Sequence, residues 1–211
     1  MATAFIAPEL ILDSNLALIH SRDRWMAVAD LHYGFELSQR AAGWLIPFWG
    51  MGNIESRLRN LIEEHGPDKL ILVGDIVHSS VAQKQAEAFV QKLSHLGPEL
   101  ILVRGNHDRG LRELNLIDCH TCSGFCFKHG HLDITSDESL TEVSGHLHPS
   151  WSFNDGAGAR VRAPALLQME KTIVLPAFSP WAAGVRCHVQ KPHRLWVCGK
   201  KRVFAVEADT D

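Results

Sequence analysis

The chain has 211 residues, of which 45% are hydrophobic, and this is enough apolar material for the core of one large domain. Its formal charge of −3 excludes a global basic field for nucleic acids or anionic membranes, so any phosphate affinity has to come from a local site. No apolar run approaches the ~20 residues of a membrane span, and five cysteines, an odd number, imply no disulfide framework. We therefore expect a single domain over residues 1–211, located in the cytoplasm, with no secretory signal and no membrane partner.

The first half of the chain alternates buried strands with amphipathic helices. Three apolar runs predict strands, at residues 25–29, 70–73 and 100–103. Apolar spacing predicts two helices between them, over residues 54–62 and 82–93, each followed by a Gly-Pro pair that stops the helix. This order of strands and helices is typical of parallel βαβ units.

The second half contains short strand candidates without predicted helices between them. Six of them lie at residues 125–127, 140–143, 165–167, 172–175, 195–197 and 203–206. Gly199-Lys200-Lys201 predicts a hairpin turn between the last two. We expect a second, mainly antiparallel sheet, and therefore an α/β fold in which two mixed sheets form a four-layer α/β/β/α sandwich.

Five short polar clusters follow one another along this pattern. They are Asp30-Leu31-His32, Gly74-Asp75, Gly105-Asn106-His107-Asp108, His129-Gly130-His131 and Gly145-His146-Leu147-His148. Each of the first three begins where a predicted strand stops, and ligands of open α/β sheets bind outside the carboxyl ends of the strands. Adjacent strands lie ~4.8 Å apart, so these loops are expected to converge on one small volume.

The clusters combine carboxylate, amide and imidazole ligands, a mixture that suits Mn, Fe or Zn better than Ca or Mg. Two divalent cations ~3.5–4 Å apart activate water, orient a phosphoryl group and stabilise charge on the attacking and leaving oxygens. A carboxylate such as Asp75 can bridge them, and Gly74 before it permits close approach. We therefore expect a dinuclear-metal-dependent phosphoester hydrolase, with Mn as the first choice of metal.

In this order, the clusters resemble the calcineurin-like metallophosphoesterase superfamily over residues 30–148. Gly-Asn-His-Asp followed by Gly-His-x-His is the most specific part of the pattern. The resemblance implies one metal on Asp30, His32, Asp75 and His148, and a second on Asp75, Asn106, His129 and His146. It also implies that His107 contacts the phosphoryl oxygen and protonates the leaving group.

Further motifs resemble the narrower ICC-like branch, which includes the DNA-ligase-associated phosphoesterases. They are Asp-Leu-His-Tyr-Gly-Phe-Glu at residues 30–36, Gly74-Asp75-Ile76-Val77-His78 and Leu175-Pro176-Ala177-Phe178. Many superfamily members carry Asp or Asn where this chain has His78. Partners in DNA repair are implied by this resemblance alone.

Residues next to the clusters have two interpretations each. We expect His78, Asp108 and His131 to contact the metal ligands and orient them without binding the metal themselves. The alternatives are a plain loop residue for His78 and direct ligation for His131. Arg104 and Arg109 can clamp a substrate phosphate through a bidentate fork, and an ordinary surface charge is the alternative for both.

An unusually apolar stretch covers residues 43–52 and contains Trp44, Phe48 and Trp49. These aromatic side chains, together with Trp151, either line a substrate cleft and stack a base, or pack in the core or against a second subunit. The second interpretation is the more common one, and it includes a homo-oligomer.

Three cysteines, Cys119, Cys122 and Cys126, lie close together with His120 between them. A zinc site would need a fourth ligand, and no second Cys-x-x-Cys pair completes it. We favour structural thiols, because free cysteines are often buried.

The expected reaction is hydrolysis of a phosphodiester in a nucleotide or nucleic acid, by attack of a hydroxide held between the two cations. Asp75, Asn106 and His107 are the expected catalytic residues, and His107 supplies the proton to the released alcohol. Two alternatives stay open, namely a phosphomonoesterase and a metal-binding scaffold module without turnover.

Overall fold

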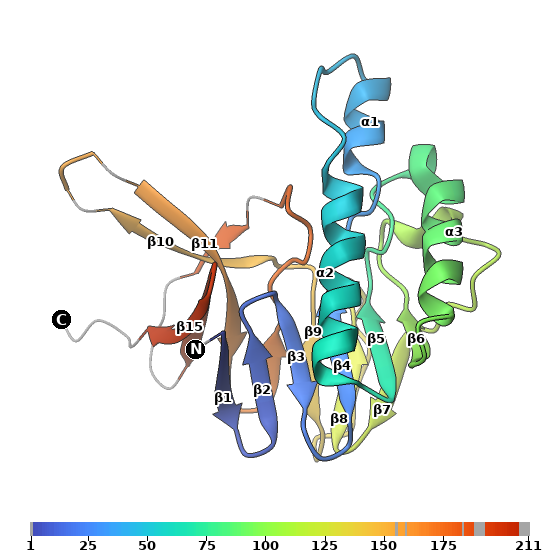
Figure 1. Ribbon diagram of the computed structural model, residues 1–211. Helices are drawn as coiled ribbons and strands as arrows, with labels where there is room; N and C mark the ends of the chain where they lie inside the picture. Colours follow the sequence, from blue (N-terminus) through green and yellow to red (C-terminus); the bar gives the residue numbers. More distant parts are fainter. Residues whose placement is uncertain (1, 155, 159, 183, 188–192, 207–211) are drawn as a thin grey trace.

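Two stacked β-sheets dominate the computed structural model, which describes residues 2–154, 156–158, 160–182, 184–187 and 193–206 (Figure 1). The strands of the first sheet, in spatial order, are β1 (Thr3–Ala7), β2 (Leu10–Asp13), β3 (Ala17–His20), β4 (Trp25–Ala29), β5 (Lys69–Val73) and β6 (Glu99–Val103). β1 to β4 pair antiparallel, whereas β4, β5 and β6 are parallel neighbours.

Helices follow each of the parallel strands of this sheet. They are α1 (Phe35–Ala41), α2 (Gly50–His65), η1 (Ser80–Ala82), α3 (Gln83–Ser94) and η2 (Asp108–Gly110), of which η1 and η2 are single 3-10 turns. α2 buries Ile54, Leu58 and Leu61, and it ends at Gly66, whose left-handed backbone (φ 51°) donates a hydrogen bond to the carbonyl of Ile62. The predicted parallel βαβαβ unit is therefore confirmed. None of the described helices is long and apolar enough to cross a bilayer.

The second sheet is mixed, as expected, with mostly antiparallel pairs. Its strands are β7 (Cys119–Cys122), β8 (Phe125–Lys128), β9 (Thr141–Ser144), β10 (Pro149–Asn154), β11 (Arg160–Gln168), β12 (Thr172–Val174), β13 (Val185–Arg186), β14 (Arg194–Gly199) and β15 (Arg202–Val206). The main path is β13-β10-β11-β12-β9-β8-β7, and β14 and β15 branch from β11 as the predicted hairpin. In the described part of the chain no helix lies between these strands, and the described helices all lie between residues 35 and 110.

One hydrophobic core joins the two sheets. Trp25 of β4 lies edge to face against Phe125 and Phe127 of β8, with ring centroids 5.1 and 5.0 Å away. The α/β class with two mixed sheets is confirmed. The sequence patterns did not predict β1, β2, β3, β7, β10, β13 or α1.

Candidate metal centre

Five strand ends bring the polar clusters together. Asp30 follows β4, Asp75 follows β5 and Asn106 lies just beyond β6, while His129 follows β8 and His146 lies between β9 and β10. Residues far apart in the chain become neighbours because both sheets end their strands at the same edge. The clusters from the first sheet thus meet those from the second.

The first group of close ligand atoms consists of Asp30, His32 and His148. His148 Nε2 lies 3.3 Å from His32 Nε2 and 3.3 Å from Asp30 Oδ1. Ligand atoms that are each about 2.1 Å from one cation lie roughly 3–3.5 Å apart. The three side chains therefore have the spacing of a shared metal ion.

The second group consists of Asp75, His129 and His146, and it adjoins the first. Asp75 Oδ2 lies 3.8 Å from His32 Nε2 in the first group and 3.6 Å from His129 Nε2 in its own. One carboxylate oxygen of Asp75 thus stands between the two groups, where a bridging ligand would lie.

The donor atoms fit divalent cations. Asn106 Oδ1 is buried and has no hydrogen-bond partner, which is costly for an amide oxygen unless another group satisfies it. Burial lowers the pKa of His32 to about 4, so its imidazole is neutral at pH 7. Burial acts to raise the pKa of Asp30, but hydrogen bonds from His129 and His148 outweigh this and lower it to about 2. Neutral imidazole and ionised carboxylate are the forms that bind metal.

The backbone is strained where these ligands lie. Nine non-glycine residues among those described have a positive φ, and five of them are Asp30, His32, Asp75, His146 and His148. Such conformations cost of order 1–3 kcal/mol each and persist where the surrounding structure holds them, often at functional sites.

Glycines allow the clusters to approach one another. A Cβ atom on Gly74 (φ 74°) would lie 2.4 Å from the His129 ring, and one on Gly145 would lie 2.6 Å from Asp30 Oδ2. Both distances are shorter than real Cβ contacts, so any larger residue would push the ligands apart.

His107 has a fixed orientation beside the two groups. Its Nδ1 lies 2.6 Å from the carbonyl oxygen of His78 and donates to it, which leaves Nε2 without the proton in the neutral ring and 3.8 Å from Asp75 Oδ2. The backbone N–H of His107 also donates to Asp75 Oδ1 at 2.9 Å. His78 therefore orients His107 through its main-chain carbonyl, while its own ring lies against His32, with the two Nδ1 atoms 3.5 Å apart.

Asp108 and His131 lie behind the ligands. Asp108 is buried and accepts hydrogen bonds from the backbone N–H groups of Val77 (3.1 Å) and Gly105 (2.8 Å), so it joins two of the ligand-bearing loops. Burial raises the pKa of Asp108 to about 6 against the effect of these bonds. His131 Nδ1 lies 3.0 Å from His129 Nδ1 and is outside both ligand groups.

The two candidate phosphate clamps lie in different surroundings. Arg104 donates to Asp118 Oδ1 and to the carbonyl of Leu116, both at 3.1 Å, so the geometry favours the alternative of a structural surface charge. Arg109 lies exposed in η2, close enough to His131 to lower the pKa of that imidazole in addition to the larger effect of burial.

An aromatic wall that sequence reasoning missed borders the histidines of the candidate site. A pocket of about 220 Å³ is lined by His32, His78, His107 and His148 together with Phe35 and Trp181. The Trp181 ring lies 5.6 Å from that of Phe35 and 4.7 Å from that of Trp49. No spacing pattern could have identified Trp181, because its partners lie more than 130 positions away in the sequence.

The apolar stretch between α1 and α2 lies on the surface. Trp44 is 65% exposed, Leu45 92% and Phe48 57%, which excludes the interpretation that they pack in the core. The substrate cleft and the second subunit stay as explanations. Trp151 lies instead in β10, where it stacks on Phe153 at 5.8 Å.

The cysteines do not form a metal site within the described part of the chain, because no group of close ligand atoms there includes a thiol. All five cysteines are free. Cys126 and Cys198 are buried, as expected of structural thiols, whereas Cys119 is exposed.

Comparisons with known proteins identify the family and the fold of the chain. Residues 24–182, about three quarters of the chain, match the sequence model of the calcineurin-like phosphoesterases. The crystal structure of nuclease MPE from Pseudomonas putida is similar, with 23% identity and a TM-score of 0.74 over 93% of this chain and 94% of that one. A phosphoesterase from E. coli, Yfce, has 15% identity and a TM-score of 0.46 over 88% and 99% of the two chains. No curated protein matches the chain.

A two-sheet α/β fold whose strand ends carry clusters of carboxylates and imidazoles, together with this match, defines a metal-dependent phosphoester hydrolase. The chain belongs to the calcineurin-like phosphoesterase family.

Proposed function

We propose that this protein is a phosphodiesterase that acts on a nucleotide or nucleic-acid substrate with two divalent cations, Mn by preference and Fe or Zn as substitutes. The observation that carries the proposal is the pair of adjoining ligand groups with Asp75 Oδ2 between them. Residues 1–211 are proposed to act as one domain, because the larger of two hydrophobic clusters contains residues of both sheets.

The ligands divide into two sets. Asp30, His32 and His148 would hold the first cation, and His129, His146 and Asn106 the second, with Asp75 shared between them. When bound, the two cations would supply positive charge to the phosphoryl oxygens and lower the pKa of an attacking water.

His107 would move the proton. Its Nδ1–H is held by the carbonyl of His78, so Nε2 is the nitrogen that can carry a proton toward the leaving oxygen. His107 lines the pocket together with Phe35 and Trp181, so the leaving group has an aromatic surface beside it. Asn106, the residue before His107 in the same loop, would steady the phosphoryl group.

A nucleotide substrate is supported by the aromatic wall. Trp49, Trp181 and Phe35 form a continuous series of rings that ends against His78, 4.7 Å from Phe35. Bases stack on such platforms with little sequence preference. The similar structure from Pseudomonas putida is that of a nuclease. Five free cysteines support a reducing, cytoplasmic location.

The test is metal-dependent hydrolysis. Purified protein is stripped of metal, reloaded with Mn, Fe or Zn, and assayed on bis-p-nitrophenyl phosphate, p-nitrophenyl phosphate and short single-stranded DNA. We expect the diester and the DNA to be cleaved faster than the monoester. Faster cleavage of the monoester would make the protein a phosphomonoesterase, and metal binding without any turnover would make it a scaffold.

A further inference from the structure

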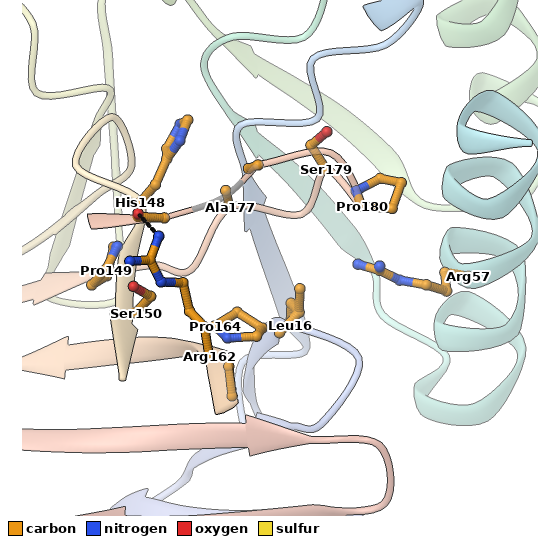
Figure 2. A pocket seen from close by; sticks show the side chains of 13 residues that line it. Leu16, Arg57, His148, Pro149, Ser150, Arg162, Pro164, Ala177, Ser179 and Pro180 are labelled. Carbon is orange, nitrogen blue, oxygen red and sulfur yellow. Dashed lines mark hydrogen bonds between the residues drawn. The ribbon is translucent and has the colours of Figure 1, made fainter. Parts of the chain in front are cut away.

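A cavity of about 370 Å³ lies next to the metal centre and has no role in the proposed chemistry. We call it the arginine cavity, and it is lined by Arg57, Arg162, His148, Ser150, Pro164 and Ser179 among others (Figure 2). It shares His148, Ser179 and Ala182 with the catalytic pocket, so the two cavities adjoin.

Arg57 brings a positive charge to this cavity, and the buried carboxylate of Asp13 attracts that charge without forming an ion pair with it in the described part of the chain. Its Nη2 donates to the carbonyl of Phe178 at 2.9 Å, and its guanidinium lies 3.9 Å from the Phe178 ring centroid. Its Nε is buried and has no partner. Asp13 is paired with His65 at 2.9 Å and makes no ion pair with Arg57 in the described part of the chain. Burial lowers the pKa of Arg57 to about 10, so the guanidinium stays charged at pH 7.

A buried charge of this kind is costly unless an opposite charge accompanies it. The carbonyl oxygens of Phe178 and Asn15, the side-chain oxygen of Asn53 and an aromatic face satisfy part of the guanidinium, but none of them carries a formal negative charge. An anion in the cavity would supply the negative charge that these contacts lack.

The other walls of the cavity also favour an anion. Arg162 enters from β11, on the side opposite to Arg57 on α2, and its Nη1 donates to the carbonyl of Gly184 at 3.4 Å (Figure 2). Ser150 is buried, and its Oγ has no hydrogen-bond partner. No Asp or Glu is among the described residues that line the cavity. The two guanidinium groups form a donor set that suits phosphate.

We propose that the arginine cavity binds the phosphate that neighbours the scissile phosphoester, so that the substrate is a nucleotide chain with at least two phosphates. This inference rests on the proposed function. A chain whose scissile phosphate lies at the metal centre and whose next phosphate lies between Arg57 and Arg162 satisfies both sites at once. The cavity thereby selects polynucleotides and nucleotide bisphosphates over simple diesters.

Kinetics on matched substrates test this proposal. Dithymidine monophosphate is compared with the same dinucleotide carrying an additional phosphate at its 5′ or 3′ end, and bis-p-nitrophenyl phosphate serves as the substrate without a second phosphate. For the unmodified protein, the additional phosphate at one of the two ends should lower KM by about 10-fold, the factor that corresponds to one good ionic contact. Equal KM values for all three dinucleotides would overturn the proposal.

Arg162→Gln should abolish this advantage while leaving kcat on bis-p-nitrophenyl phosphate unchanged. Arg160→Gln is the matched control, since Arg160 lies on the same strand but does not line the cavity. Arg57→Gln should act as Arg162→Gln does, and Arg57→Lys should retain part of the effect. If Arg57→Gln does not fold, Arg162→Gln alone decides the outcome. An unchanged advantage in Arg162→Gln would contradict the assignment.

Binding to the metal-free protein gives a readout independent of turnover. After chelation and dialysis, calorimetry compares thymidine 3′,5′-bisphosphate with thymidine and with inorganic phosphate. The bisphosphate should bind at least about 10-fold more tightly than either, and Arg162→Gln should remove the difference. Inorganic phosphate that binds as tightly as the bisphosphate would indicate a site for free anions and overturn the proposal. Failure of bis-p-nitrophenyl phosphate hydrolysis would instead reject the proposed function, and calorimetry would then decide on the cavity alone.

Discussion

The metal centre and the arginine cavity share His148, yet they are built in opposite ways. The metal centre gathers the carboxylates of Asp30 and Asp75 with imidazole nitrogens, a donor set that suits divalent cations. The arginine cavity gathers Arg57 and Arg162 with no acidic residue in its described lining, so it lacks negative charge. Cations at the metal centre, together with a phosphate chain that extends from them into the arginine cavity, would supply the opposite charges that the two sites lack.

The two regions also differ in how the chain produces them. The metal ligands come from short motifs at strand ends, and strained backbone and glycines hold them together. The arginines come from the middle of α2 and of β11, which carry no motif. The residues of a catalytic centre can thus lie in short sequence motifs. The residues of the neighbouring pocket come from separate elements, and only the packing of those elements brings them together.

The largest effect should come from the residue at the middle of the metal centre. Asp75→Asn removes the charge that both ligand groups share, so activity should fall by about 10³-fold or more and bound metal should decrease. The measurement is kcat with metal analysis of the same sample. Asp118→Asn, at a surface carboxylate, is the control, and a full metal content in Asp75→Asn would contradict the shared role.

The next effect tests the acid beside the metal centre. His107→Ala should leave metal content unchanged and reduce kcat by ~10²–10⁴ on substrates with a poor leaving group, because no group then protonates the released alcohol. With p-nitrophenol as leaving group, the loss should be much smaller. Equal losses for good and poor leaving groups would show that His107 acts in some other way.

Trp181→Leu tests whether the aromatic wall of the pocket binds a nucleotide base. Stacking of one base is worth about 1–3 kcal/mol, so KM for single-stranded DNA should rise by about 10-fold or more while bis-p-nitrophenyl phosphate is unaffected. Trp151→Leu serves as the control because Trp151 packs in the second sheet, away from the pocket. An equal change in KM for both substrates would indicate a structural role for Trp181.

Metal removal should lower stability. A cation present at 100 times its Kd contributes about 2.7 kcal/mol to the free energy of unfolding. For a chain of this length, this corresponds to roughly 5–10 °C in Tm. Thermal melting with and without chelator measures the shift. The same shift in Asp75→Asn would place the stabilising metal elsewhere.

The smallest effect is expected at Arg104. Exposed ion pairs such as that between Arg104 and Asp118 contribute about 0–1 kcal/mol. Arg104→Gln should therefore change both kcat/KM and Tm only slightly, in contrast to Arg162→Gln. A large rise in KM for DNA would restore Arg104 as a substrate clamp.

Much of the architecture was predictable because it depends on local patterns. Buried runs such as residues 70–73 and helix stops such as Gly66 are decided within a few positions of the chain, and the βαβαβ unit follows from them. The five clusters were equally visible, since each places its polar residues within four positions. Their convergence followed from parallel strands that end at one edge of a sheet.

By itself, the sequence determined the parallel unit, the two-sheet α/β class and the residue types that a metal-dependent phosphoesterase requires. Only the tertiary structure decided that Asp75 Oδ2 stands between the ligand groups, that His78 orients His107 through a carbonyl, and that Trp181 borders the pocket. It also decided that Arg57 and Arg162 face one cavity. The physical reason is that these contacts join residues from separate elements. Such contacts depend on how the sheets and helices pack, and the spacing of residues along the chain does not predict that packing.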